Sequence, residues 1–306
     1  MKTISEAPQE VPVAAVCNRL DQEFNIAAIN DDWSFSFDDA FRAQAVQRFL
    51  EPNKNTGLFL QFGSTVSQIY TAFAPSHFVL QEIKRRGIKN ALLVVKHPFD
   101  WDGSATGQGF LPLTAADYQV MREMGLSLYS LHTPWDKNRN DAFVSTAYGF
   151  AKEIGFVPER EFAADPANPD LILGLIGTLP VDTVDEVSEL LQQRLGYKVK
   201  SIKHHNRAQK VALVTGGGFI PSLIQEAKDA GCDLYITGII SANASEWSKN
   251  KHAKTQAKVE AIGINVIGAS HYLTEKFAPQ HSLRFFEELG LPAAFIEDTQ
   301  ALERLE

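Results

Sequence analysis

Short apolar runs alternate with segments of helical periodicity along most of this chain, and this alternation restricts the fold more than any other feature. We expect strands at residues 91–95, 126–132, 210–215, 233–238 and 264–271. We expect helices at residues 114–125, 141–155, 183–196, 221–230 and 282–290. Strands separated by helices in this way are typical of sheets covered by helices, so the sequence predicts an α/β fold.

Two of the expected helices carry residues that are typical of a helix start. Thr114 and Asp117 have the spacing of a capping box, and so do Thr183 and Glu186. Gly196 follows the second of these helices at a position where a glycine commonly ends a helix. These residues give the expected starts of both helices and the expected end of the second.

Local breaks in the sequence indicate where the domains begin and end. Residues 1–30 show no clear period, which indicates a loosely packed N-terminal arm. The stretch 161–170 is polar and contains prolines, which makes it the best candidate for a lobe boundary. This division predicts a first lobe over residues 31–160 and a second lobe over residues 161–306.

Overall composition excludes several classes of protein. The 306 residues are 44% hydrophobic and 22% charged, and no apolar run approaches the roughly 18 residues that span a bilayer. The N-terminus lacks the basic start and apolar core of a signal peptide, so we expect a cytoplasmic protein. A net charge of −8 argues against a general binder of nucleic acid. Cys17 and Cys232 are too few for a disulfide framework or a cysteine metal site.

Three of the predicted strands end on side chains that can do chemistry. The pairs that follow them are Lys96 and His97, His132 and Asp136, and His271 and Glu275. Ligands usually bind beyond the strand ends of an α/β sheet, and imidazole with carboxylate is a ligand set that Zn, Fe or Mn accepts. A single histidine at a strand end is usually an ordinary hydrogen-bonded residue. Such residues follow three different strands, and this repetition is the reason to propose a shared metal site.

Two other motifs favour structural roles. Residues 216–218 are glycines between a strand and a helix, but they lack the lysine and serine or threonine of a phosphate-binding loop. We expect them to form a tight turn or to allow close backbone packing. His204 and His205 lie in a basic polar turn, for which a solvated loop is the better interpretation.

Five segments in order, "KHPFDW", "LHTPWD…ND", "VALVTGGG", "DLYITG" and "GASHYLTEKFA", resemble the GTP cyclohydrolase type-2 homologue family. This family is also known as the NIF-three-like, or NGG-one-interacting-factor-three-like, proteins. Upstream, "NTGLFLQFG" at residues 55–63 looks like an early Asn-Val-Gly-Leu segment of the family. The resemblance covers about residues 35–297, which is nearly the whole chain.

The resemblance implies two α/β lobes with mixed sheets covered by helices, assembled as a ring-like homohexamer. It also implies a divalent metal site, with one or two Zn, Fe or Mn ions per subunit, in the cleft between the lobes. The residues that match the ligand positions of the family are His97, Asp136, His271 and Glu275. His132 matches a position close to the metal, and His132 or Glu275 is expected to move protons.

Lys96 departs from the family pattern, which usually has the first histidine of a His-His pair at this position. A protonated lysine has three donors and no lone pair to offer a metal. One interpretation is that the protein binds a single ion, or holds a second one weakly. The other is that the ammonium of Lys96 replaces the charge of a cation, and holds Asp136 or an anionic substrate group.

Two function classes follow from the resemblance. A metal-dependent hydrolase would activate water against a nucleotide-like or phosphorylated small molecule. A non-catalytic metal-binding regulator or scaffold would act through protein–protein contacts, and the change at Lys96 suits a loss of catalysis. The family does not fix the substrate, because one fold supports many activities.

Overall fold

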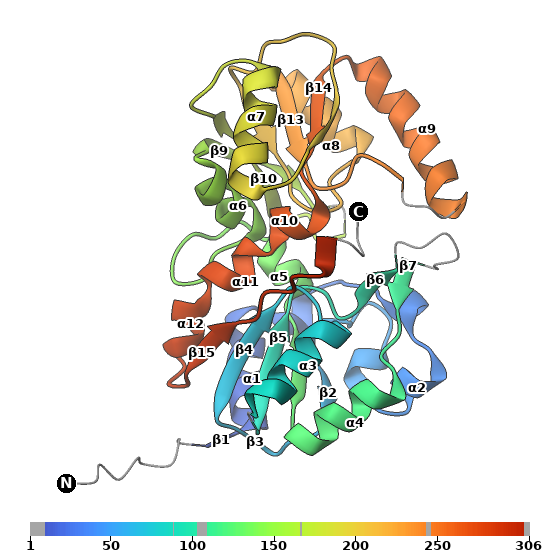
Figure 1. Cartoon of the computed structure of the whole chain (residues 1–306), viewed down its shortest axis with the longest axis vertical. Coiled ribbons are helices and arrows are strands. Elements are labelled where there is room, and N and C mark those ends of the chain that lie inside the picture. Colours follow the sequence, from blue (N-terminus) through green and yellow to red (C-terminus); the bar gives the residue numbers. More distant parts are fainter. Residues whose placement is uncertain (1–9, 88, 103–108, 166, 243–245, 303–306) are drawn as a thin grey trace, which may run out of the picture. The chain divides into compact units, whose positions relative to one another are not determined.

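The computed structural model describes residues 10–87, 89–102, 109–165, 167–242 and 246–302 (Figure 1). The chain forms two compact units, each built from separate stretches of sequence. The first unit comprises residues 1–99, 112–132 and 282–298, and the second unit comprises residues 100–111, 133–281 and 299–306.

A five-stranded mixed sheet forms the centre of the first unit. Its strand order is β15 (Ala293–Phe295), β4 (Gln68–Ala72), β5 (Ala91–Val95), β8 (Ser127–Ser130) and β2 (Gly57–Gln61). The first four strands are parallel, and β2 runs antiparallel to β8. All five residues of β5 are buried, as expected for a central strand whose two faces are both covered.

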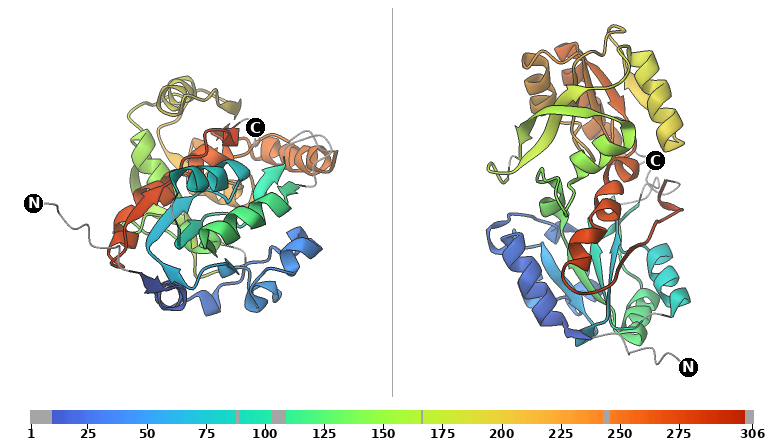
Figure 2. Two further views of the ribbon diagram at one scale, coloured as in Figure 1. Left: turned by 60° about the horizontal axis from the view of Figure 1, so that its bottom comes forward. Right: turned by 90° about the vertical axis from the view of Figure 1, so that its left-hand side faces the viewer.

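Helices cover both faces of this sheet. Helices α3 (His77–Arg86) and α4 (Ala115–Met124) lie on one face, and α1 (Val13–Glu23) lies on the other (Figure 2). Helix α1 falls within the predicted N-terminal arm, and its apolar side is buried because Val13, Val16, Cys17 and Leu20 recur at helical spacing.

A six-stranded mixed sheet forms the centre of the second unit. Its strand order is β11 (Lys200–Ile202), β14 (Asn265–Gly268), β13 (Leu234–Thr237), β12 (Val211–Leu213), β10 (Ile172–Thr178) and β9 (Val157–Ala164). Strands β12, β13 and β14 are parallel, and the other three strands are antiparallel to their neighbours. Residues 161–164 belong to the stretch that the sequence suggested as a lobe boundary. In the structure they are part of β9, which pairs with β10 as a hairpin.

Two apolar layers enclose this second sheet. One layer contains residues of α6 (Thr146–Ile154) and α7 (Val184–Leu195), and the other contains residues of α8 (Pro221–Asp229) and α9 (Glu246–Ile262). The capping boxes predicted at Thr114 and Thr183 are both present, and Gly196 ends α7 in the left-handed conformation. The predicted α/β fold, with mixed sheets covered by helices, is confirmed.

The remaining elements are short. They are β1 (Val11–Pro12), β3 (Thr65–Val66), β6 (Asp100–Asp102), β7 (Gly109–Leu111), α2 (Asp39–Arg42), α5 (His132–Asp136), α10 (His271–Glu275), α11 (Phe277–His281), α12 (Leu283–Glu287) and three 3-10 helices, η1 (Ile26–Ala28), η2 (Ser34–Ser36) and η3 (Gln47–Leu50). Among the described residues, no helix has the length and apolar character needed to cross a membrane.

Candidate metal centre

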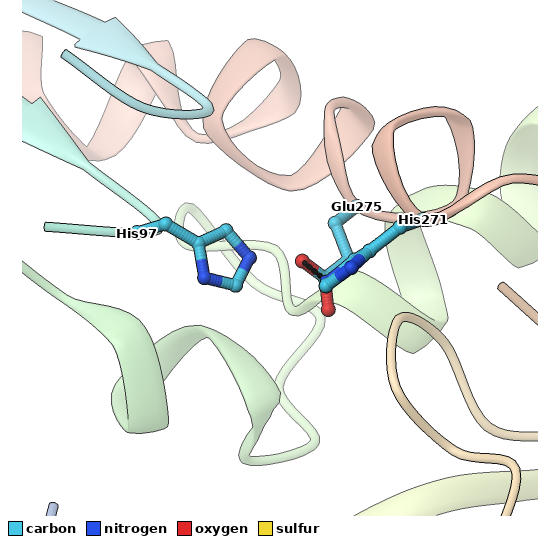
Figure 3. A group of neighbouring side chains, drawn as sticks. All are labelled: His97, His271 and Glu275. Carbon is cyan, nitrogen blue, oxygen red and sulfur yellow. Dashed lines mark ion pairs between the residues drawn. The ribbon is translucent and has the colours of Figure 1, made fainter. Parts of the chain in front are cut away.

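The short helix α10 brings a buried histidine and a buried glutamate side by side. The helix begins just after strand β14 with Ser270, whose side chain accepts a hydrogen bond from the backbone N–H of Leu273. His271 and Glu275 are four residues apart, so their side chains lie on the same side of the helix. His271 Nε2 lies 3.2 Å from Glu275 Oε2, and Figure 3 marks this ion pair. Both side chains are almost completely buried.

The loop after β12 passes directly against this pair through Gly216. The residue has a positive φ of 58°, which an L side chain rarely adopts. A Cβ atom built on it would lie 1.9 Å from Glu275 Oε1 and 3.1 Å from His271 Nε2. The close backbone packing predicted for the glycine triplet is confirmed at this position, because only a bare backbone fits beside the carboxylate.

Hydrogen bonds and an aromatic ring hold the surroundings of α10 in place. The N–H of Gly216 donates to Thr274 Oγ1 at 3.0 Å, and the carbonyl of Gly216 accepts from the N–H of Gly238 at 3.1 Å. The ring of Trp101 packs edge-on against the ring of His271, with 4.6 Å between the ring centroids. These contacts restrict the orientation of the imidazole and the carboxylate.

Asp136, the next predicted ligand, ends helix α5. Its Oδ1 accepts a hydrogen bond of 3.2 Å from the hydroxyl of Thr146, which begins helix α6. The Thr146 hydroxyl accepts in turn from Thr215 Oγ1 at 2.8 Å. Thr215 directly precedes Gly216 in sequence, so a chain of two hydroxyls links the Asp136 carboxylate to the loop that packs against Glu275.

Lys96 and His97 follow the buried strand β5, and both side chains are buried. The N–H of His97 donates to the carbonyl of Phe73 at 2.8 Å, and its ring packs against the ring of Phe73 with 4.7 Å between centroids. The ammonium of Lys96 donates a hydrogen bond to the backbone carbonyl of His132 at 3.2 Å. The strand end is therefore a closed, polar environment rather than a solvated loop.

His132 makes a side-chain contact that the sequence did not reveal. Its Nδ1 lies 3.0 Å from Asp31 Oδ2, and its ring centroid lies 5.0 Å from that of His97. Trp33 packs edge-on against both imidazole rings, with centroids 4.8 Å from His132 and 5.8 Å from His97. Asp31 and Trp33 follow no predicted strand, so a search of strand ends does not find them.

Among the described residues, three buried side chains offer atoms of the kind that bind a metal ion: His97 in the first unit, and His271 and Glu275 in the second. His271 and Glu275 come from one short helix of the second unit, and Figure 3 draws these three side chains. Two imidazoles and a carboxylate fit the preferences of borderline divalent ions such as Zn²⁺. Asp136, the fourth predicted ligand, is not one of this group.

The chain is similar in sequence to relatives from two organisms. The chain is 28% identical over 256 residues to a GTP cyclohydrolase 1 type 2 homolog of Archaeoglobus fulgidus, a match that covers 81% of this chain and 93% of the relative. It is 25% identical over 246 residues to the protein of the same name in Borreliella burgdorferi, covering 80% of this chain and 88% of the relative.

A solved structure supports the same fold. The protein ybgI, described as a protein of unknown function, superimposes with a TM-score of 0.67 at 22% sequence identity, covering 94% of this chain and 98% of that chain. The family model of Duf34/NIF3 (NGG1p interacting factor 3) matches residues 39–300. The resemblance seen in the sequence motifs is thereby confirmed, and the chain belongs to the Duf34/NIF3 (NGG1p interacting factor 3) family.

Proposed function

We propose that this chain binds a divalent metal ion, Zn, Fe or Mn, and uses it to hydrolyse a nucleotide-like or phosphorylated small molecule. His271 and Glu275 are the central ligands of this proposal, with His97 and Asp136 as further ligands. The single observation that supports it most is the buried pair on α10, with its Nε2 and Oε2 atoms 3.2 Å apart and bare backbone packed against the carboxylate.

The burial of this pair is the physical reason to favour a metal. A buried carboxylate costs several kcal/mol unless a cation or hydrogen bonds compensate for its lost hydration. A neutral imidazole offers a lone pair and the carboxylate supplies a negative charge, and both are donors that a divalent ion such as Zn²⁺ accepts. The glycine at position 216 keeps the carboxylate at this place, because any larger residue would displace it.

The residues around the ion have separate tasks in this proposal. When bound, the ion would polarise the attacked group and lower the pKa of a water molecule. Thr146 orients the Asp136 carboxylate through the 3.2 Å hydrogen bond, and Trp101 restricts the ring of His271. His132 or Glu275 moves the protons, since both can accept a proton from water and return it to the leaving group.

The names of the relatives support the substrate class. Two relatives are called GTP cyclohydrolase 1 type 2 homologs, and a purine nucleotide is a polar, phosphorylated substrate of the kind proposed for this chain. We also expect the protein to be a homohexamer in the cytoplasm. Light scattering of the purified protein measures the first of these expectations.

A second function is favoured by Lys96. Its buried ammonium donates to the carbonyl of His132 at a position where the family resemblance leads us to expect a ligand histidine. A metal-binding regulator or scaffold that no longer hydrolyses a substrate would tolerate this change. Turnover separates the two functions, since a scaffold releases no product from any nucleotide.

Metal content and hydrolysis test the proposal together. The variants His271→Gln and Glu275→Gln should lose most of the bound metal, measured by elemental analysis of the purified protein. Two exposed residues of the second unit provide matched controls, His204→Gln and Glu189→Gln, which should keep it. Full metal content in His271→Gln and Glu275→Gln would overturn the proposed site.

Activity is measured on a panel of nucleotides and phosphoesters with added Mn, Zn or Fe. The hydrolase proposal expects turnover that Asp136→Ala abolishes while the oligomer remains intact. If the metal-loaded protein turns over no member of the panel, the hydrolase function is wrong and the scaffold function is favoured.

A further inference from the structure

Two residues that precede the family match contact both imidazoles of the first unit. The match begins at residue 39, whereas Asp31 and Trp33 lie before it. Asp31 reaches the ring of His132, and Trp33 packs against the rings of His132 and His97. Neither residue has been given a role by the family motifs.

The backbone of this segment is anchored to the chain that leads into strand β2. The N–H of Asp31 donates to the carbonyl of Asn53 at 3.3 Å, and the N–H of Asn55 donates to the carbonyl of Asp31 at 3.0 Å. The side chain of Asn55, which is completely buried, accepts from the N–H of Trp33. These bonds fix Asp31 and Trp33 in position before any ligand binds.

The carboxylate of Asp31 accepts hydrogen bonds from Trp33 and Thr56 and faces the ring of His132. Trp33 Nε1 donates to Oδ1 at 3.0 Å, Thr56 Oγ1 donates to Oδ2 at 3.0 Å, and His132 Nδ1 lies 3.0 Å from Oδ2. An ionised carboxylate is an acceptor only, so the nitrogen of His132 that faces it must carry a hydrogen. In the neutral imidazole this leaves the lone pair on Nε2.

His132 is also held through its backbone. Its carbonyl accepts the hydrogen bond from the buried ammonium of Lys96, and its ring lies edge-on to Trp33. The ring therefore has a fixed partner at Nδ1, an aromatic wall beside it and an anchored backbone. An imidazole held in this way is preorganised for proton transfer, because it needs no reorientation during the reaction.

We propose that Asp31 is a positioning residue, which holds His132 in the tautomer with hydrogen on Nδ1 so that Nε2 accepts the proton of the attacking water. This inference rests on the proposed hydrolase function. In the reaction, the water oxygen forms the new bond and its proton passes to Nε2. The proton then moves from Nε2 to the leaving group as the scissile bond breaks, while the hydrogen on Nδ1 stays on that nitrogen and keeps its hydrogen bond to Asp31.

The tautomer of His132 is measured directly by NMR of protein labelled with ¹⁵N at histidine. The resonances of His132 are identified by their loss in His132→Gln. In the unmodified protein, purified and loaded with zinc, we expect hydrogen on Nδ1 and a lone pair on Nε2. Hydrogen on Nε2 in the unmodified protein would overturn the inference, and this measurement does not require any Asp31 variant to fold.

Replacing the carboxylate tests the cause of the tautomer. Asp31→Asn offers an amide that can either accept or donate, so the preference for hydrogen on Nδ1 should be lost or reversed. Asp39→Asn, an exposed aspartate of helix α2, is the matched control and should leave the His132 spectrum unchanged. An unchanged spectrum in Asp31→Asn would contradict the proposed role of Asp31.

Kinetics distinguish positioning from a merely structural role. With zinc content retained, Asp31→Asn should lower kcat by about 100-fold or more and leave KM within about twofold, since general base catalysis contributes about 10² to 10⁴ in rate. Equal kcat values would overturn the inference even if the metal site is correct. If the unmodified protein hydrolyses nothing although Asp31 fixes the tautomer, the hydrolase function fails and the structural role of Asp31 stands.

Discussion

The close approach of Gly216 to Glu275 gives the sharpest test of the candidate metal centre. In Gly216→Ala, the added Cβ would lie 1.9 Å from Glu275 Oε1, whereas real Cβ atoms keep at least 3.0 Å from such a neighbour. The atom it meets is the far end of a side chain, so the carboxylate can swing away without unfolding the second unit. The substitution therefore acts on the position of the proposed ligand.

Two separate effects can be estimated. An alanine at a φ of 58° costs about 1 to 2 kcal/mol of folding free energy, because its Cβ approaches the following carbonyl oxygen. Moving the carboxylate by about 1 Å takes it outside the tolerance of about 0.2 Å for a metal–ligand distance. We expect zinc affinity to fall by about 10- to 100-fold, comparable with the loss caused by disturbing the partners of metal ligands.

A second glycine separates these effects. Gly196 ends helix α7 with a φ of 64°, and a Cβ built on it meets nothing within 4 Å. Gly196→Ala should therefore lose a similar folding free energy and bind zinc as the unmodified protein does. Urea unfolding in the presence of a chelator measures the first quantity, and competitive zinc titration measures the second.

The comparison has a clear negative outcome. If Gly216→Ala and Gly196→Ala bind zinc with the same affinity as the unmodified protein, then Glu275 is not a ligand in the geometry described. The reasoning from close backbone packing to metal binding would then be wrong, even if both variants lose stability as estimated.

Three further predictions concern other parts of the molecule. The unmodified protein should bind one ion tightly per subunit and Lys96→His should gain a second; two tightly bound ions in the unmodified protein would contradict this. Thr146→Val should weaken metal binding by about 10-fold while helix α6 persists in circular dichroism, because the Asp136 carboxylate loses its 3.2 Å hydrogen bond; unchanged affinity would remove Thr146 from the site. Burial raises the pKa of Cys17 to about 12 and that of Cys232 to about 11, so at pH 8 about one thiol in a thousand or fewer is ionised. Iodoacetamide should label the folded protein far more slowly than the urea-unfolded one, with a rate that rises about tenfold per pH unit below these values; equal rates in both states would refute the burial of the thiols.

Local patterns predicted the regular elements well because they act over a few residues. The apolar run at residues 91–95 is a buried strand, and the threonines at positions 114 and 183 begin their helices as the capping spacing indicates. His271 and Glu275 share one face of α10 because four residues make about one helical turn. In each case the relevant physical interaction joins near neighbours in sequence.

Contacts between distant residues were the part that the sequence did not reveal. Asp31 meets His132 across 101 residues, and its backbone is placed by pairing with residues 53–55. No local period marks such a residue. Helix α1 is different, since Val13, Val16 and Leu20 do have helical spacing, but no capping side chain marks the start of the helix and residues 1–30 as a whole show no clear period.

The discontinuous build of the first unit has a consequence for synthesis of the chain. Strand β4 ends at Ala72, and its parallel neighbour β15 begins only at Ala293. At about 5 to 20 residues per second, the ribosome needs roughly 10 to 45 seconds to supply that neighbour. During this interval the unpaired edge of β4 carries backbone donors and acceptors that another nascent chain can pair with. Truncation before residue 293 leaves that edge open permanently, so such fragments should aggregate rather than persist as a folded first unit.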